Sequence, residues 1–270
     1  MTTQAEKAQA FKTLHEKDEI FIIPNPWDAG SARLMQGLGF KALATTSAGF
    51  AQSLGRLDGQ VSVDEKIEHC RGLCAVTDIP ISADFENGFA DSPEKAAVNL
   101  VKVAGAGVVG GSIEDYSGSG IYDFSLAVER IAACADAVSQ LSFPFTLTAR
   151  AENLLRGVND LDDTIKRLQA FEAAGADVLY APGLCNLDQV KQVMDSVNKP
   201  VNVLFVFMPD VSLEQYTELG VRRISIGGAL ANYASGAILK ASKQMLTSGG
   251  FDWVKDAASG AELKTLLTSR

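Results

Sequence analysis

The 270-residue sequence has few of the residues on which histidine-based active sites depend. It contains two histidines: His15 lies in a charged leading segment, and His69 lies inside a predicted helix, far from any predicted strand end. Catalytic triads, zinc centres and Cys-His pairs all need a histidine close to the reacting group. None of these three kinds of site is therefore expected.

Cysteine is also scarce, and its spacing shows no Cys-x-x-Cys pair. Such a pattern gives no sign of a zinc site or of a thiol redox motif. We predict buried, reduced thiols, as in a cytoplasmic protein, for all four cysteines: Cys70, Cys74, Cys134 and Cys185.

The sequence has no long apolar run and no excess of basic residues. Its longest apolar runs, such as Ile20–Pro24 and Val203–Met208, are far shorter than the ~20 residues that span a bilayer. The segment 1–18 is polar and charged, which predicts a leading helix or tail and not a secretory signal. With 24 Lys and Arg against 33 Asp and Glu, the net charge is −9. This charge argues against a nucleic-acid partner, and the short runs argue against a membrane.

A repeat of glycines indicates the architecture. Gly39, Gly107, Gly175 and Gly220 each follow a helical pattern and precede an apolar run, as glycine does just beyond a helix C-terminus. The first three are equally spaced, and each interval fits two strand–helix units of roughly 30–35 residues.

Eight apolar runs alternate with amphipathic segments, which predicts a parallel sheet covered on both faces. Eight such units favour a closed (β/α)8 TIM barrel, in an α/β fold forming one domain over residues 1–270, with a C-terminal helical arm at 250–270. No Gly-x-Gly-x-x-Gly follows the first run, which argues against a dinucleotide site. The predicted strands are Ile20–Pro24, Ala42–Thr46, Ile81–Phe85, Val108–Ile113, Phe145–Ala149, Val178–Ala181, Val201–Phe207 and Arg223–Gly227.

Polar residues gather where these strands end, which in a barrel is the edge that carries the active site. Asp84 and Glu86 are two residues apart, so we expect them to point to the same side of their strand, and the same holds for Arg150 and Glu152. Two carboxylates ~4 Å apart repel by about 4 kcal/mol at an effective dielectric constant of 20. A hard divalent cation such as Mg²⁺ or Mn²⁺ would relieve that repulsion. The alternative is that these acids only cap helices or pair with lysines.

Five ordered motifs resemble the isocitrate lyase/phosphoenolpyruvate mutase superfamily, and the resemblance covers nearly the whole chain. The motifs are Asn25-Pro-Trp-Asp-Ala-Gly30, Thr46-Ser-Ala-Gly49 followed by Ser53-Leu-Gly-Arg-Leu-Asp58, Asp84-Phe-Glu-Asn-Gly88, Ser112-Ile-Glu-Asp115 and Ala149-Arg-Ala-Glu152.

The resemblance implies a barrel whose last helix is exchanged between subunits, usually in a homotetramer. It implies Mg²⁺ or Mn²⁺ held, directly or through water, by residues matching Asp58, Asp84, Glu86 and Glu114. Here Glu86 replaces the aspartate that is commoner in the family. The carboxylate of a small oxo acid would be bound by the segment Thr46, Ser47 and Ala48 and by Arg150. We assign Arg150, Asp58 and Glu114 as catalytic and add Asn25, Glu152 and Asn202 to the substrate site.

Two departures from the family limit the predicted function. The connection Asp115–Tyr122 lacks the Lys-Lys-Cys-Gly-His loop of isocitrate and methylisocitrate lyases, and the Lys and Asn of the mutase lid are also missing. We predict a Mg²⁺-dependent lyase or decarboxylase that acts on a small α-oxo or α-hydroxy acid through a metal-stabilised enolate. The alternatives are a C–P or C–C hydrolase of the phosphonopyruvate or oxaloacetate type, or an oxo-acid-binding barrel without turnover. We also predict a homo-oligomer, a dimer or tetramer, with Phe251–Leu267 packed on a neighbouring subunit.

Overall fold

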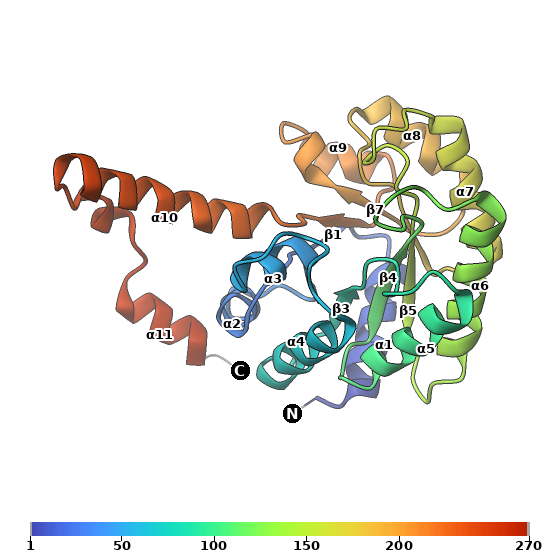
Figure 1. Cartoon of the computed structure of the whole chain (residues 1–270), viewed down its shortest axis with the longest axis horizontal. Coiled ribbons are helices and arrows are strands. Elements are labelled where there is room, and N and C mark those ends of the chain that lie inside the picture. Colours follow the sequence, from blue (N-terminus) through green and yellow to red (C-terminus); the bar gives the residue numbers. More distant parts are fainter. Residues whose placement is uncertain (1, 269–270) are drawn as a thin grey trace.

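Eight parallel strands form a nearly closed barrel in the computed structural model, which describes residues 2–268 (Figure 1). The strand order is β1-β8-β7-β6-β5-β4-β3-β2, and one backbone bond of 3.0 Å, from the Ala44 N–H to the Pro24 carbonyl, joins β2 to the end of β1. The predicted (β/α)8 barrel is therefore confirmed. Residue 1 of the predicted leading segment and residues 269–270 of the predicted arm lie outside the described residues. The strands are β1 (Phe21–Ile23), β2 (Leu43–Ala44), β3 (Ile81–Asp84), β4 (Gly110–Glu114), β5 (Thr146–Arg150), β6 (Val178–Tyr180), β7 (Val201–Leu204) and β8 (Arg223–Ser225).

Helices follow the strands and cover the outside of the barrel (Figure 1). Sequence signals mark several of their starts: Ser62 and Glu65 form a capping box, and Ser92 caps a helix that begins at Pro93. The helices are α1 (Gln4–Glu16), α2 (Ala29–Gly37), α3 (Ser47–Ser53), α4 (Val63–Val76), α5 (Pro93–Ala104), α6 (Phe124–Ser139), α7 (Leu161–Ala173), α8 (Leu187–Ser196), α9 (Leu213–Glu218), α10 (Ala229–Ser248) and α11 (Gly260–Thr268), with 3₁₀ turns η1 (Phe205–Phe207) and η2 (Asp252–Asp256).

The leading segment is a helix that closes the amino-terminal end of the barrel. Ala8 and Phe11 of α1 are fully buried and pack against Ile23 and Val109. The fit is close at Gly110, where an added Cβ would lie 2.8 Å from the Phe11 ring and 2.9 Å from the Thr146 carbonyl oxygen. Because α1 blocks that end, access to the barrel interior is from the carboxyl ends of the strands.

Most of the predicted strands were too long, and two show this clearly. The run predicted to extend to Phe207 ends at Leu204 and continues as η1, and the run predicted from Val108 begins at Gly110. Val108 and Phe205 still pack on the core beyond the strand ends, so hydropathy alone did not mark where the ladder hydrogen bonds stop.

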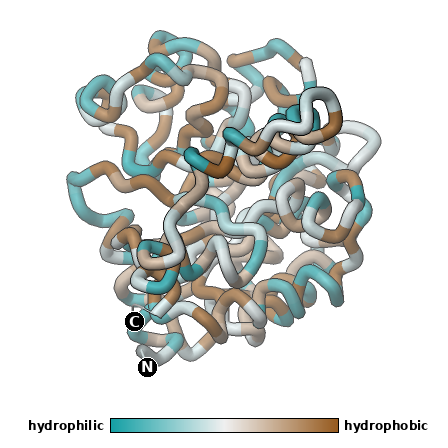
Figure 2. The backbone as a smooth tube through the Cα atoms, turned by 90° about the vertical axis from the view of Figure 1, so that its left-hand side faces the viewer, coloured by the Kyte–Doolittle hydropathy of each residue, from teal (hydrophilic) through white to brown (hydrophobic). Residues whose placement is uncertain are grey.

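The helix after β8 does not cover the barrel. α10 extends away from it, and Figure 2 views the molecule from the side toward which α10 projects. Large apolar side chains on this segment face solvent: Tyr233 is 78 % and Leu246 is 87 % exposed. The chain then returns through η2, and α11 packs against α2 of the same chain, where Arg33 donates a hydrogen bond to the Leu267 carbonyl. Subunit exchange of the last helix therefore stays a prediction.

None of the helices within residues 2–268 is both long and apolar enough to cross a membrane.

We expect this protein to be a homo-oligomer in which α10 packs on a neighbouring subunit. Burying a leucine side chain contributes roughly 1.5–3 kcal/mol, so the double variant Leu239→Asp, Leu246→Asp should lower the mass measured by size-exclusion chromatography with light scattering. Leu213→Asp, at a half-exposed leucine on α9, is the control that should leave the mass unchanged. A monomeric wild-type protein at micromolar concentration would contradict this prediction.

Candidate active site

The carboxyl ends of the strands enclose a cavity of about 160 Å³, and all eight strands contribute to its lining. At roughly 30 Å³ per water molecule, it holds about five waters or an acid of a few carbons. The lining includes most of the predicted substrate and metal residues: Asn25, Thr46, Ser47, Ala48, Asp58, Asp84, Arg150 and Asn202.

Arg150, the last residue of β5, is shared by three carboxylates. Its guanidinium lies 2.8 Å from Asp84 Oδ1, 3.2 Å from Glu114 Oε2 and 2.7 Å from Glu152 Oε1. Burial disfavours its charge, but Glu152, Glu114 and Asp84 outweigh that effect and hold the pKa of Arg150 well above its usual value. The predicted convergence of Asp84, Glu114 and Arg150 at one rim is confirmed, and a bound acid would have to share Arg150 with them.

Asp84, at the end of β3, is held as a carboxylate. Its Oδ2 accepts a 2.9 Å hydrogen bond from the backbone N–H of Ser47, and its own N–H donates to Thr45 Oγ1. Burial acts to raise the pKa of Asp84, but the charges of Arg150 and Lys66 and the Ser47 bond lower it further than burial raises it. Ser47 therefore orients Asp84 from the start of α3.

The pKa values of two neighbouring acids, Glu86 and Glu114, are raised. Burial, followed by the negative charge of Asp84, raises the pKa of Glu86 to about 7, with a smaller contribution from Asp58. Burial also raises the pKa of Glu114 to about 8, although Arg150 opposes the shift. Burial is thus the main cause of both upward shifts, and the neighbouring acids add to it.

The predicted reason for Glu86 lying near Asp84 was wrong. β3 ends at Asp84, and Glu86 has a positive φ of 47°, so the two-residue alternation of a strand does not relate them. The turn after β3 sets the position of Glu86 instead. The corresponding pair Arg150 and Glu152 does make contact, through hydrogen bonds of 3.0 and 2.7 Å.

The four predicted metal ligands lie around one rim but do not form one coordination sphere. No three Asp, Glu, His or Cys side chains among residues 2–268 are close enough together to hold a metal ion. Asp84 and Glu114 both turn toward Arg150, and Asp58 is exposed on the loop before α4. The donor chemistry nevertheless fits a hard divalent cation, because every donor is a carboxylate oxygen.

Two of the predicted substrate residues use their amide groups to tie the barrel together. Asn25 donates to the Thr45 carbonyl and accepts from the N–H groups of Ile226 and Gly227. Asn202 donates to Ser225 Oγ and accepts from Arg223. Both therefore shape the cavity, with the polar atoms of their side chains already paired.

Thr46 and Glu152 are also engaged by protein groups. Thr46 caps α3, with its hydroxyl accepting from the Gly49 N–H. Glu152 is fully buried, and its two carboxylate oxygens bind Arg150 and Arg156. Any role of Glu152 toward a substrate would therefore run through Arg150.

The floor of the cavity holds a cation that we did not predict. Arg223 is buried and donates to Asn202 Oδ1, Thr148 Oγ1 and, at 3.2 Å, to Nε2 of His15 from α1. Burial lowers the pKa of Arg223 to about 10, and no carboxylate within residues 2–268 forms an ion pair with it. The alternation Arg223-Ile-Ser225 was a usable signal, because Ile224 faces the helices and its neighbours must face inward.

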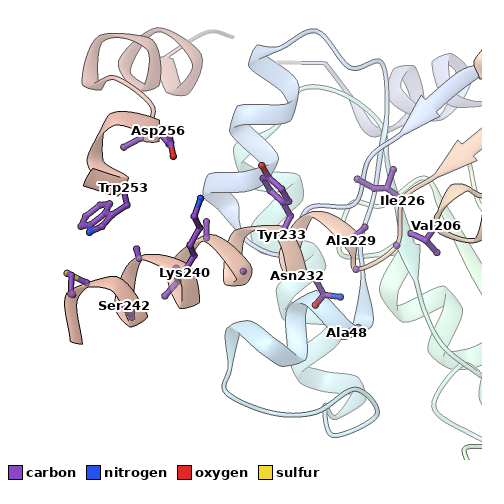
Figure 3. Close-up of a pocket in the computed structure, with 18 of the residues that line it drawn as sticks. Ala48, Val206, Ile226, Ala229, Asn232, Tyr233, Lys240, Ser242, Trp253 and Asp256 are labelled. Carbon is purple, nitrogen blue, oxygen red and sulfur yellow. The ribbon is translucent and has the colours of Figure 1, made fainter. Parts of the chain in front are cut away.

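A larger hollow of about 1340 Å³ follows α10 and is lined mainly by apolar residues (Figure 3). It adjoins the smaller cavity, since Ala48, Leu204 and Gly228 line both. It contains none of the carboxylates described above. We therefore place the chemistry in the smaller cavity and regard the larger one as the surface predicted to meet a second subunit.

Comparison with known proteins agrees with this geometry. The sequence model of the phosphoenolpyruvate phosphomutase family matches residues 11–246. The chain belongs to that family. A solved structure from Burkholderia cenocepacia J2315, provisionally described as a lyase/mutase, is 48 % identical, covers 98 % of this chain and 97 % of its own, and has a TM-score of 0.95. An uncharacterized protein of Mycobacterium tuberculosis is 30 % identical over 89 % of this chain and 90 % of its own length. The oxaloacetate decarboxylase of Paraburkholderia xenovorans is 27 % identical over 92 % of this chain and 84 % of its own. The predicted superfamily is thus confirmed.

In this member of the phosphomutase family, the connection after β4 folds onto itself. Tyr116 and Ile121 form an antiparallel bridge, and Arg156 lies 3.8 Å from the centre of the Tyr116 ring. Tyr122, at the end of this loop, is buried, and its hydroxyl donates to Asp91. The short loop is therefore a fixed part of the rim that covers Glu152 and Glu114 through Arg156.

The cysteines have no role at the rim. All four thiols are free; Cys70 and Cys134 are buried as predicted, whereas Cys74 is only half-buried. Cys185 is exposed, because it lies in the loop before α8 and not on the buried face of a helix, so its predicted burial was wrong.

We expect Glu114→Gln to stabilise the metal-free protein increasingly as pH rises from 5.5 to 8.5. A carboxyl whose pKa is raised by folding contributes stability at low pH and loses it as pH increases through the folded-state value of about 8. Glutamine mimics the protonated form, so the difference in Tm between Glu114→Gln and wild type should grow with pH in EDTA. Glu68→Gln, at an exposed glutamate, is the control. A pH-independent difference would contradict the raised pKa.

Proposed function

We propose that this chain is a divalent-metal-dependent enzyme that cleaves a C–C bond in a small α-oxo or α-hydroxy carboxylic acid, as a lyase or decarboxylase. One observation carries the proposal: a cavity of about 160 Å³ is lined by Arg150, Asp58 and Asp84, and Glu114 binds Arg150 from outside that lining. Such a cavity suits a short acid, an arginine suits its carboxylate, and carboxylate oxygens suit a hard metal ion.

Asp84 would hold the metal, with Asp58, Glu86 and Glu114 contributing directly or through water. When bound, Mg²⁺ or Mn²⁺ would act as a Lewis acid on the oxo or hydroxy oxygen of the substrate. Arg150 would bind the substrate carboxylate with N–H groups that it shares with Asp84 and Glu114, and the segment Thr46–Ala48 would offer further hydrogen bonds at the start of α3.

Named relatives support this reaction class. Besides the oxaloacetate decarboxylase, the 2-methylisocitrate lyase of Escherichia coli is 29 % identical over 72 % of this chain and 68 % of its own. A phosphonopyruvate hydrolase that shares the fold, at 21 % identity and a TM-score of 0.85, was solved with oxalate and Mg²⁺. A C–P or C–C hydrolase is therefore the alternative enzyme. The four free thiols suit a reducing compartment, which is the basis of the expected cytoplasmic location.

A barrel that binds an oxo acid without turnover is the alternative outside enzymes. The loop after β4 offers no cysteine and no lysine between Asp115 and Tyr122. Catalytic lids exclude water and complete the active site. In this chain the segment at that position is only the short loop Asp115–Tyr122.

The decisive assay is turnover of a panel of acids with and without Mg²⁺. We expect acids of about three to five carbons to react and isocitrate and methylisocitrate to react weakly, because the cavity is small. Asp84→Asn, which keeps the size of the side chain and an acceptor for Ser47, should lose metal-dependent activity while its Tm shows an intact fold. Binding without turnover of any acid would favour the non-catalytic alternative, and efficient isocitrate cleavage would contradict the proposed substrate size.

Arg150→Lys should lower kcat/KM by about 10–150-fold. Lysine keeps the positive charge among the carboxylates but lacks the planar fork, and a charge-assisted hydrogen bond of this kind contributes roughly 1.5–3 kcal/mol. The matched control is Arg222→Lys, because Arg222 directly precedes β8, at the end of the barrel away from the rim, and pairs with the exposed Asp18. Steady-state kinetics with the best acid of the panel measure both. Full activity in Arg150→Lys would show that this arginine does not bind the substrate carboxylate.

A further inference from the structure

Lys66 is a buried lysine whose ammonium group has no hydrogen-bond partner among residues 2–268. It lies on the first turn of α4, its side chain is 1 % exposed, and its Nζ makes no bond to any protein atom in that range. It continues the buried stripe of Cys70 and Leu73, a place where a helix normally carries an apolar residue. A buried, unpaired charge is costly, so its presence needs an electrostatic explanation.

A second buried lysine, Lys7, has the hydrogen-bond acceptor that a buried ammonium group normally needs. Lys7 of α1 is also buried, but its Nζ donates a 2.6 Å hydrogen bond to the Thr77 carbonyl at the amino-terminal end of the barrel. Lys66 has no such acceptor. Lys66 and Lys7 therefore form a natural comparison of two buried ammonium groups, one satisfied locally and one not.

The surroundings of Lys66 include no counter-ion on its own helix. Its Nζ lies 5.9 Å from the centre of the Phe50 ring, and the other nearby ring, His69, stacks on Phe50 at 3.7 Å. His69 is uncharged near neutral pH, because burial and the charge of Lys66 lower its pKa to about 3. The negative charge close to Lys66 must therefore come from outside this aromatic pair.

That negative charge is the acid cluster of the rim, which we define as Asp58, Asp84 and Glu86. α4 packs against β3, whose last residue is Asp84, and α3 carries both Phe50 and the Ser47 N–H that binds Asp84. Lys66 lowers the pKa of both Asp84 and Glu86, and for Glu86 its effect is larger than that of Arg150. The buried ammonium therefore lies close enough to Asp84 and Glu86 to act on both electrostatically.

We propose that Lys66 is the resident counter-charge of the acid cluster and that it competes electrostatically with the divalent cation expected there. This inference rests on the proposed function, which places a metal at Asp84. A fixed positive charge near a site repels a second cation, and salt screens a buried charge only weakly. Lys66 therefore weakens metal binding and keeps the metal-free cluster stable, so that loading of the site follows the concentration of free metal.

The test is Mn²⁺ binding, followed by the electron paramagnetic resonance signal of free Mn²⁺. The measurement is made under nitrogen at pH 8, where protons compete little with the metal for the carboxylates. Lys66→Met keeps an unbranched apolar side chain and removes the charge. We expect its Kd for Mn²⁺ to fall tenfold or more relative to wild type, while Lys7→Met, the matched control, stays within twofold of wild type. The rise in Tm on adding Mg²⁺ to the metal-free protein should be larger in Lys66→Met than in wild type.

Lys66→Gln, which is neutral but can form hydrogen bonds, repeats the test if Lys66→Met does not fold. Tighter binding in either neutral variant supports the inference, and so does Mn²⁺ binding that is detectable only in the variants. Wild-type binding that equals or exceeds binding by the neutral variants overturns the inference and leaves the proposed metal site in place. Absence of Mn²⁺ binding in wild type and in both variants overturns the inference together with the proposed metal dependence.

Discussion

The ion pairs of Arg150 join the ends of three neighbouring strands. Arg150 on β5 binds Asp84 on β3, Glu114 on β4 and Glu152 just beyond its own strand. Without this one guanidinium, three largely buried carboxylates would repel one another where water screens them little. The shape of the cavity therefore depends on a cation that a substrate would also use. Burial, together with the charge of neighbouring acids, raises the pKa values of Glu86 and Glu114 despite Arg150.

The barrel interior is polar where a barrel is usually filled by branched apolar side chains. Thr148, Asn202, Arg223 and Ser225 are buried there, and His15 from α1 completes their hydrogen bonds. Buried polar groups cost free energy unless they are paired, and here the hydrogen bonds among these side chains offset that cost. The acids lie at the rim, and Arg223, which has hydrogen bonds but no carboxylate partner among residues 2–268, lies at the floor. Negative and positive charge are therefore separated along the barrel axis.

Much of the candidate site could be predicted because strand ends are local features. Alternating apolar and amphipathic segments identified the barrel, and the polar residues after each run pointed to its carboxyl-terminal rim. Asp84, Glu114 and Arg150 do meet there. The exact ligand set could not be predicted, since a turn with a positive φ at Glu86 and the loop that exposes Asp58 break the strand periodicity on which the argument relied.

The sequence by itself determined the order of the elements, the helix caps, the family and the acidic character of the rim, because each depends on residues close together in the chain. Only the tertiary structure decided which charges face one another. Arg223 meets His15, from the other end of the chain, and Lys66 acts on Asp84 although no periodicity links a lysine on the first turn of a helix to a strand end. Electrostatic pairing acts through space over several ångströms, and distances in space are fixed by packing and not by separation along the chain.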